Sequence, residues 1–135
     1  WQAVSDAQNA RRIVWLGEPF NASAPERFTG TMQFMCSRED LISQTIEAFV
    51  HFAHCASEVV YCDIEGMRGR LSNGIMGMLL FDAMTHSLDG STGAGDHGID
   101  GLEAFVEQHE CNDICVGLTL HMEDDLEDWL DRLRG

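Results

Sequence analysis

The sequence predicts an α+β fold, and three observations indicate that class. Short apolar runs rich in β-branched residues read as strands, and longer stretches with apolar residues every three or four positions read as helices. Their expected order is strand, helix, strand, strand, helix, helix, which differs from a regular parallel βαβ array. An apolar fraction of 44% in 135 residues is enough for a packed core, so we expect one domain, or part of one, over residues 1–135.

The first expected elements are a strand and a long helix. Arg12–Leu16 (R-I-V-W-L) reads as a strand that Glu18-Pro19 ends. Ser37 is the expected helix N-cap, and Glu39 and Asp40 in the first turn favour the positive end of the helix dipole. Apolar residues then follow with a helical period at Leu41, Ile42, Ile46, Phe49, Val50 and Ala53.

Two further strands and two helices are expected after this helix. Val59–Ile64 reads as a buried strand, and the turn signal Asn73-Gly74 predicts that Ile75–Phe81 pairs back as a second strand. Ile99–Gln108 is expected to be helical, and Glu123–Leu133 reads as an amphipathic helix with a solvated acidic face.

Charge and hydropathy exclude several kinds of partner. Eight basic residues stand against 23 acidic ones, for a net charge of −15, and all eight are arginines. Nucleic acids and anionic membrane surfaces require clustered positive charge, so we expect neither as a partner. No stretch approaches the roughly 20 consecutive apolar residues of a membrane span.

The run H-E-C-N-D-I-C contains three side chains that can bind a metal, His109, Cys111 and Cys115. A helix would place the two sulfur atoms one turn apart on one face. Zinc closes a structural site with four thiolate and imidazole ligands, and His86 is the candidate for the fourth. The alternative is a pair of buried free thiols beside a surface histidine.

Five cysteines do not form a disulfide framework, so Cys36, Cys55 and Cys62 are expected to be reduced thiols in a cytoplasmic protein.

Carboxylates follow the two central strands. Asp63 and Glu65 point to the same side of an extended segment, and Asp82 follows the next strand. If these strands are neighbours, the three carboxylates converge and can hold a hard cation such as Mg²⁺. Acidic residues at strand ends are, however, more often turn formers.

A glycine-rich loop, Leu88–Gly98, could cradle phosphate through its N–H groups, although no G-K-[ST] follows it.

Six segments follow one another along the chain in an order typical of one enzyme family. They are Glu18-Pro19, Ala48–Phe52 (A-F-V-H-F), Asp63–Gly66 (D-I-E-G), Phe81–His86 (F-D-A-M-T-H), Gly93–Gly98 (G-A-G-D-H-G) and Phe105–Cys115. Together they resemble the hinge, helix end, D-[LI]-Q-G segment, [TF]-D-P-x-x-H segment, G-x-G-N-x-G loop and F-x-x-x-H-x-C-N-x-x-C zinc segment of the atypical alpha-type protein kinases. The long turn between the third and fourth segments looks most like that of fungal members.

The resemblance implies an ATP-dependent protein serine/threonine kinase and a role for each segment. Asp63 would orient or deprotonate the substrate hydroxyl, Glu65 and Asp82 would hold Mg²⁺, and Glu18 would help to hold ATP. The loop residues that would contact substrate or phosphate are Gly93, Gly95, Asp96 and Gly98. The ligands of a structural zinc ion would be His86, His109, Cys111 and Cys115.

The resemblance runs from Arg12 to Leu120 and corresponds to the hinge and C-terminal lobe, so we expect residues 1–135 to be a single such lobe and a piece of a longer protein. The N-terminal lobe and its phosphate-binding lysine have no counterpart, and this chain contains no lysine. Glu65 stands where the family has Gln, Ala83 where it has Pro, and Asp96 where it has Asn.

Three interpretations therefore stay open. The chain is the C-terminal lobe of an active kinase that acts on a protein substrate. Alternatively it is an inactive pseudokinase lobe, a zinc-stabilised module that binds a basic protein or forms a homodimer through the cleft facing the missing lobe. A zinc domain without kinase ancestry is the third.

Overall fold

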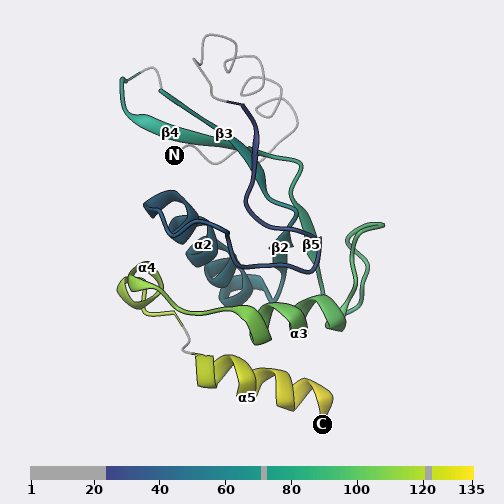
Figure 1. Cartoon of the computed structure of the whole chain (residues 1–135). Coiled ribbons are helices and arrows are strands. Elements are labelled where there is room, and N and C mark those ends of the chain that lie inside the picture. The colour runs from purple at the N-terminus through teal and green to yellow at the C-terminus, as the bar shows by residue number, and fades with distance from the viewer. Residues whose placement is uncertain (1–23, 71–72, 121–122) are drawn as a thin grey trace. The chain divides into compact units, whose positions relative to one another are not determined.

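The computed structural model of this protein describes residues 24–70, 73–120 and 123–135 (Figure 1). The expected strand Arg12–Leu16 and the candidate ATP ligand Glu18 lie outside these residues. The chain divides into two compact units, residues 1–26 with 66–79 and residues 27–65 with 80–135. Helices and strands are both present, which confirms the α+β class. The single-lobe assignment of residues 1–135 stays a prediction.

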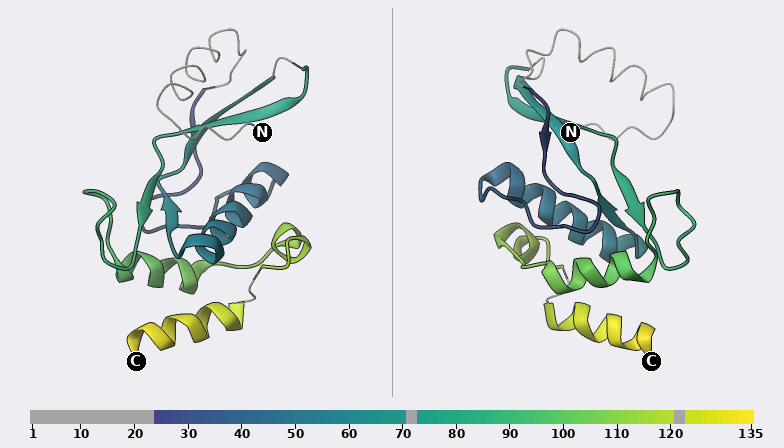
Figure 2. Two further views of the ribbon diagram at one scale, coloured as in Figure 1. Left: turned by 180° about the vertical axis from the view of Figure 1, so that it is seen from behind. Right: turned by 45° about the vertical axis from the view of Figure 1, so that its right-hand side comes forward.

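The larger unit is built from four helices and a small antiparallel pair of strands. Helix α2 (Leu41–Ser57) and helix α3 (Ile99–Gln108) both pack against β2 (Val60–Cys62), and α3 also contacts β5 (Met84–His86). The short helix α4 (Asp113–Gly117) packs on α2. Figure 2 shows α5 (Glu123–Arg134) on the side of α3 that faces away from the β2–β5 pair.

The core lies where α2, α3 and the β2–β5 pair meet. Its largest fully buried apolar side chains are Phe105, Ile64, Leu102, Leu126, Val50 and Val60. Burying side chains of this size contributes about 1.5–3 kcal/mol each. Two expected helices are confirmed, because α3 has the predicted bounds and α5 buries Leu126 and Leu130.

Helix α2 begins later than the sequence suggested. Its N-cap is Asp40 rather than Ser37, because the Asp40 carboxylate accepts a hydrogen bond of 2.9 Å from the Ser43 N–H. Glu39 and Asp40 are therefore outside the first turn, which holds no acidic residue. The helix ends at Ser57, and its C-cap residue Glu58 takes the left-handed conformation, with φ of 57°.

The strand pairing also differs from the expected hairpin. The strand β4 (Met76–Phe81) pairs with β3 (Glu65–Arg70), which in turn pairs with β1 (Glu26–Arg27), while β2 pairs with β5 in the register Val60–His86. The reason is a break at Asp63, which has φ of 51° and donates its N–H to the Gly30 carbonyl at 3.0 Å. Asp63 thus lies between two strands instead of at the end of one.

Candidate functional site

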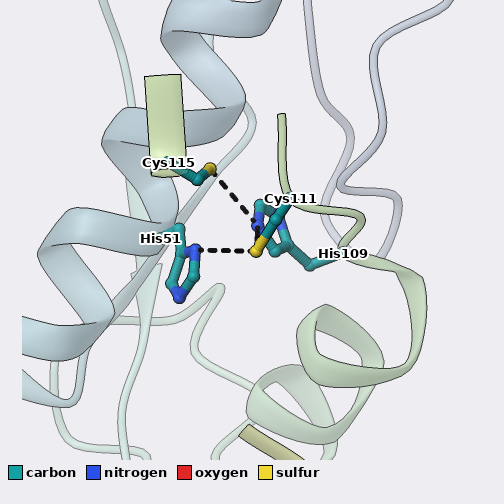
Figure 3. Close-up of side chains that lie close together, drawn as sticks. All are labelled: His51, His109, Cys111 and Cys115. Carbon is teal, nitrogen blue, oxygen red and sulfur yellow. Dashed lines mark hydrogen bonds between the residues drawn. The ribbon is translucent and has the colours of Figure 1, made fainter. Parts of the chain in front are cut away.

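Four buried or half-buried ligands meet between α2 and the segment after α3. His51 of α2, His109, Cys111 and Cys115 each offer one ligand atom, and these atoms all lie within 4.8 Å of one another (Figure 3). The Cys111 sulfur is 3.7 Å from His51 Nδ1 and 3.7 Å from His109 Nε2, and the Cys115 sulfur is also 3.7 Å from His109 Nε2.

The local sequence positions three of these ligands through helix ends. His109 is the C-cap of α3 in an extended conformation, which turns the chain toward α2. Asn112 then caps α4 by accepting hydrogen bonds from the Ile114 and Cys115 N–H groups, and its amide donates to the Gln44 carbonyl of α2. Cys111 therefore precedes α4, so the expectation that one helix carries both sulfurs was wrong: Asn112 starts a new helix between them.

The four ligands fit a zinc ion. Zinc–sulfur and zinc–nitrogen bonds of about 2.0–2.3 Å at tetrahedral angles place neighbouring ligands about 3.5 Å apart. Three of the six separations are 3.7 Å, close to this value, and all six are within 4.8 Å. Burial, followed by the nearby His51 and His54, lowers the pKa of His109 to about 4, so its imidazole is neutral and able to bind a metal near pH 7.

The fourth member of this cluster is His51, whereas the sequence had suggested His86. The His86 ring is fully buried elsewhere, with both nitrogens engaged. Its Nδ1 accepts from the His97 N–H at 2.9 Å, and its Nε2 lies 2.6 Å from the Thr31 carbonyl, which can only accept. Nε2 therefore carries the proton, and His86 joins the glycine loop to the loop after β1 instead of binding a metal.

The glycine loop is organised around the Asp96 carboxylate, whose side chain is fully buried. Five hydrogen bonds reach it from Ser87, Thr92 and Gly98, three of them from backbone N–H groups. Burial alone would raise the pKa of Asp96, but these hydrogen bonds outweigh it and lower the pKa well below its usual value. These N–H groups point to the loop's own carboxylate, so they do not form an open phosphate cradle. Of the three glycines expected to contact phosphate or substrate, Gly98 donates to Asp96, Gly93 is exposed and Gly95 is half-buried.

Asp63 and Glu65 are brought together by Arg27. Its NH1 lies 3.0 Å from Asp63 Oδ1, and its NH2 lies 2.9 Å from Glu65 Oε1, so one guanidinium bridges both carboxylates. The Thr31 hydroxyl lies 3.0 Å from both oxygens of Asp63. The candidate catalytic aspartate is therefore held by Arg27 of β1 and by Thr31 of the loop that follows β1.

Asp82 shares an unusual backbone conformation with Asp63. Their φ angles are 56° and 51°, in the left-handed region that costs energy for residues other than glycine and is often found at functional sites. Over residues 24–70, 73–120 and 123–135, the His51–Cys115 cluster is the one group of His, Cys, Asp and Glu placed to hold an ion. Asp63, Glu65 and Asp82 do not form such a group, so the expected convergence of the three carboxylates is not present in this structure.

Three residues of these sites were missed by reading the sequence alone. His51 was interpreted as structural, although it lies within A-F-V-H-F, a segment that already carried the family resemblance. Arg27 and Thr31 had no such signal, since they lie in the short segment E-R-F-T-G-T, which matches no motif. Only the pairing of β1 with β3 places them beside Asp63.

Comparison with protein families and curated proteins identifies relatives. The model of the alpha-kinase family matches residues 2–115. Alpha-protein kinase 1 of Dictyostelium discoideum is 34% identical over 86 residues, which are 62% of this chain and 6% of that protein. Myosin heavy chain kinase B of the same organism is 26% identical over 111 residues, 80% of this chain and 14% of that protein. The chain thus spans a small part of these relatives, and the fungal resemblance finds no support in them.

Solved structures share the fold. The alpha-kinase domain of myosin-II heavy chain kinase A, as apoenzyme, superposes with a TM-score of 0.56 at 24% identity, covering 73% of this chain and 35% of that one. An inactive form of the same domain in complex with ATP gives a TM-score of 0.57 at 23% identity, covering 74% of this chain and 36% of that one.

In the described part of our chain, no helix has the length and apolar character needed to cross a bilayer.

Proposed function

We propose, from the premise that this chain belongs to the alpha-kinase family, that it forms the C-terminal lobe of an ATP-dependent protein serine/threonine kinase. The observation that carries the proposal is the position of Asp63. Its carboxylate is mostly buried, with 16% of the side chain exposed, and it is oriented by Arg27 and by the Thr31 hydroxyl. A fixed carboxylate of this kind suits the residue that accepts or orients the proton of an attacking hydroxyl.

Zinc has a structural role in this proposal. His51, His109, Cys111 and Cys115 would hold the ion, and it would supply folding free energy by linking α2 to the segment after α3. The proposed zinc ligands and the candidate catalytic residues are different side chains, so zinc would support the lobe without taking part in phosphoryl transfer.

ATP and Mg²⁺ are the ligands we propose for the completed domain. In kinases Mg²⁺ neutralises the charge of the transferred phosphoryl group. Glu65 and Asp82 are the side chains proposed to reach it, with Asp63 close by and Glu18 near the ribose. Asp63 and Glu65 are paired with Arg27 in the present arrangement. The exposed part of the glycine loop around Gly93 is proposed to face the protein substrate, while the buried Asp96 carboxylate, which accepts from the Gly98 N–H, would hold the loop in shape.

Phosphate transfer from ATP is the direct test. The protein is incubated with labelled Mg-ATP and a basic protein substrate, and phosphoserine and phosphothreonine are measured. We expect Asp63→Asn to lose transfer, while Asp128→Asn, which removes an exposed charge from α5, retains it. Equal transfer by wild-type protein and Asp63→Asn would refute an enzymatic role for Asp63 in this chain.

A binding module without phosphotransferase activity is the second candidate. The sequence contains no lysine, and phosphoryl transfer depends on neutralising phosphate charge. In this case the acidic surface would bind a basic protein or a second copy of the chain. Thermal shift with Mg-ATP separates the two functions. A ligand at about 100 times its Kd stabilises by about 2.7 kcal/mol, so a nucleotide site gives a clear shift and a module gives none.

A cytoplasmic location is part of the proposal. It is supported by the five cysteines, which are all free in the structure, as expected in a reducing compartment.

A further inference from the structure

We propose that His86 is a positioning residue for Asp63. It acts through Thr31, whose carbonyl bonds to the His86 ring and whose hydroxyl bonds to the Asp63 carboxylate. The same ring is joined to the glycine loop, so the placement of Asp63 depends on the shape of the loop that is proposed to face the protein substrate. This inference rests on the proposed function in taking Asp63 as the carboxylate that orients the substrate hydroxyl, but its contacts can be measured without phosphate transfer.

Asp63 has a backbone conformation that requires support. Its φ of 51° lies in the left-handed region, which costs energy for a residue other than glycine and persists only where surrounding contacts fix it. Those contacts come from the loop after β1. The Asp63 N–H donates to the Gly30 carbonyl at 3.0 Å, and the next N–H, of Ile64, donates to the Thr29 hydroxyl at 3.1 Å. The Thr31 hydroxyl lies 3.0 Å from both Asp63 carboxylate oxygens, so the position of Asp63 follows that of the loop.

His86 fixes this loop at Thr31. The Nε2–H of the imidazole donates to the Thr31 carbonyl, with 2.6 Å between nitrogen and oxygen. The backbone of His86 is itself fixed, because it pairs with the fully buried Val60 of β2. Thr31 thus accepts a hydrogen bond at its carbonyl and donates one from its hydroxyl. A single residue therefore connects the end of β5 to the candidate catalytic carboxylate.

Packing holds the imidazole of His86 in one orientation. The ring is fully buried and makes an edge-to-face contact with Phe34, with 6.0 Å between the ring centroids. Helix α3 closes the space beside it, because a Cβ atom at Gly101 would lie 2.2 Å from His86 Cγ. A side chain whose rotamer is locked by packing and by hydrogen bonds at both nitrogens can set the position of the residues bonded to it.

The second ring nitrogen joins His86 to the glycine loop. Nδ1 accepts a hydrogen bond of 2.9 Å from the His97 N–H. The preceding residue, Asp96, is the buried carboxylate that keeps this loop in shape. The glycine loop, the imidazole, Thr31 and the Asp63 carboxylate therefore form one continuous chain of hydrogen bonds. A substrate that distorts the loop would loosen Asp63, whereas one that fits the loop would leave Asp63 in place.

Two substitutions of His86 separate its two hydrogen bonds. In His86→Asn the side-chain oxygen lies near the present position of Nδ1 and can accept from the His97 N–H, but the side chain is too short to reach Thr31. In His86→Gln the amide nitrogen lies near the present position of Nε2 and can donate to the Thr31 carbonyl, while the bond to the glycine loop is lost. Both variants lose the packing of the ring, so each is the matched control of the other.

Hydrogen exchange at the Asp63 N–H measures the support that this residue receives. We expect exchange about tenfold faster in His86→Asn than in the wild type, the effect of losing one hydrogen bond, and within about twofold of the wild type in His86→Gln. The Glu58 N–H, which bonds to the His54 carbonyl at the end of α2, reports any general loss of stability and is the internal control. Equal exchange at Asp63 in the two variants, after this correction, would overturn the proposal.

Asp96→Asn tests the dependence of Asp63 on the glycine loop. The substitution weakens the hydrogen bonds that shape the loop. Exchange at the Asp63 N–H should rise at least about threefold when Asp96→Asn is made in the wild type. The same substitution should have little effect in His86→Gln, where the bond between ring and loop is already lost. Equal changes in both backgrounds would overturn the link between the loop and Asp63.

A measurement on the wild type keeps the proposal testable if neither His86 variant folds. Nitrogen nuclear magnetic resonance of the His86 ring identifies the nitrogen that carries the proton. We expect the proton on Nε2, protected from exchange with water. A proton on Nδ1 would overturn the proposal, because the Thr31 carbonyl would then have no donor in the ring.

Phosphate transfer is measured separately. If the wild type transfers phosphate, His86→Asn should lower kcat about tenfold and leave the KM for ATP within about twofold, because it misplaces a carboxylate that acts on the substrate hydroxyl. A higher KM for ATP with unchanged kcat would overturn the positioning role. A wild type without transfer, combined with the expected exchange at Asp63, would refute the kinase proposal and support the positioning of Asp63 by His86.

Discussion

The Cys111 sulfur lies 3.7 Å from His51 Nδ1, although 60 positions separate the two residues in the chain. This contact joins the middle of α2 to the segment after α3 and completes a set of two imidazoles and two thiols. It makes His51, and not His86, the proposed fourth zinc ligand.

The first prediction separates these two histidines. His51→Ala should lower zinc affinity by at least about tenfold, because three ligands remain and water has to fill the fourth position. His86→Ala should keep about one zinc ion per chain, even if it lowers stability. Zinc content after dialysis against a weak chelator measures both variants. Zinc loss in His86→Ala with retention in His51→Ala would contradict the assignment.

Removing zinc should destabilise the larger unit. The ion is proposed to supply folding free energy to a cluster that links α2 to α4, so a chelator should lower the unfolding temperature. Circular dichroism during heating, with and without chelator, measures the change, and re-addition of zinc is the control. Replacement by Co²⁺ should produce the charge-transfer absorption of two thiolates, which Cys111→Ser should halve. An unfolding temperature that is independent of chelator would exclude a structural metal.

Gly101→Ala tests the buried position of His86. A Cβ atom at Gly101 would lie 2.2 Å from His86 Cγ, and the ring is held on both nitrogens and cannot move aside easily. Overpacking of this kind costs typically about 1–3 kcal/mol, which chemical denaturation can measure. Gly117→Ala is the matched control, because its Cβ would have no atom within 4 Å, and alanine should be neutral or slightly stabilising there. Equal stability of both variants would show that His86 has room to shift.

Acid should destabilise the protein partly through Asp96. Its folded-state pKa is lowered, so the unfolded chain takes up a proton at higher pH than the folded one. The contribution to stability is full above the usual aspartate pKa, which is about 3.9, and is lost as the pH falls below it. The slope of unfolding free energy against pH between about 5 and 3 should be smaller in Asp96→Asn than in wild type. Asp128→Asn, which removes an exposed carboxylate, should leave the slope nearly unchanged.

Thiol alkylation should distinguish the cysteines. Burial, followed by the charge of Glu47, raises the pKa of Cys36 to about 12, and burial with the charge of Asp63 raises that of Cys62 to about 12 as well. Only a thiolate reacts, so both should be alkylated far more slowly near pH 8 than Cys55 in zinc-loaded protein. Mass spectrometry after timed quenching gives the order of reaction. Chelation should make Cys111 and Cys115 reactive, and rapid labelling of Cys62 would contradict its buried position.

Much of the secondary structure could be predicted from local patterns. Helices α3 and α5 were predicted because their apolar residues recur at helical spacing, and β4 because it is a continuous apolar run after a turn signal. The start of α2 was misplaced by a few residues, since Ser37 and Asp40 are both good caps and only the hydrogen bond to Ser43 decides between them. The pairing partner of β4 was wrong because the left-handed conformation at Asp63 leaves no mark in the sequence.

The sequence by itself determined the family through the order of its motifs and the α+β class through its apolar patterns. It also determined three of the four cluster residues, because the spacing within a short segment fixes which side chains can meet. Only the tertiary structure decided the fourth ligand and the partner of Asp63. His51 and Arg27 reach their sites through the packing of α2 and the pairing of β1, across 58 and 36 positions of chain from His109 and Asp63. Contacts over such separations depend on how whole elements dock, and local patterns of residues do not encode that docking.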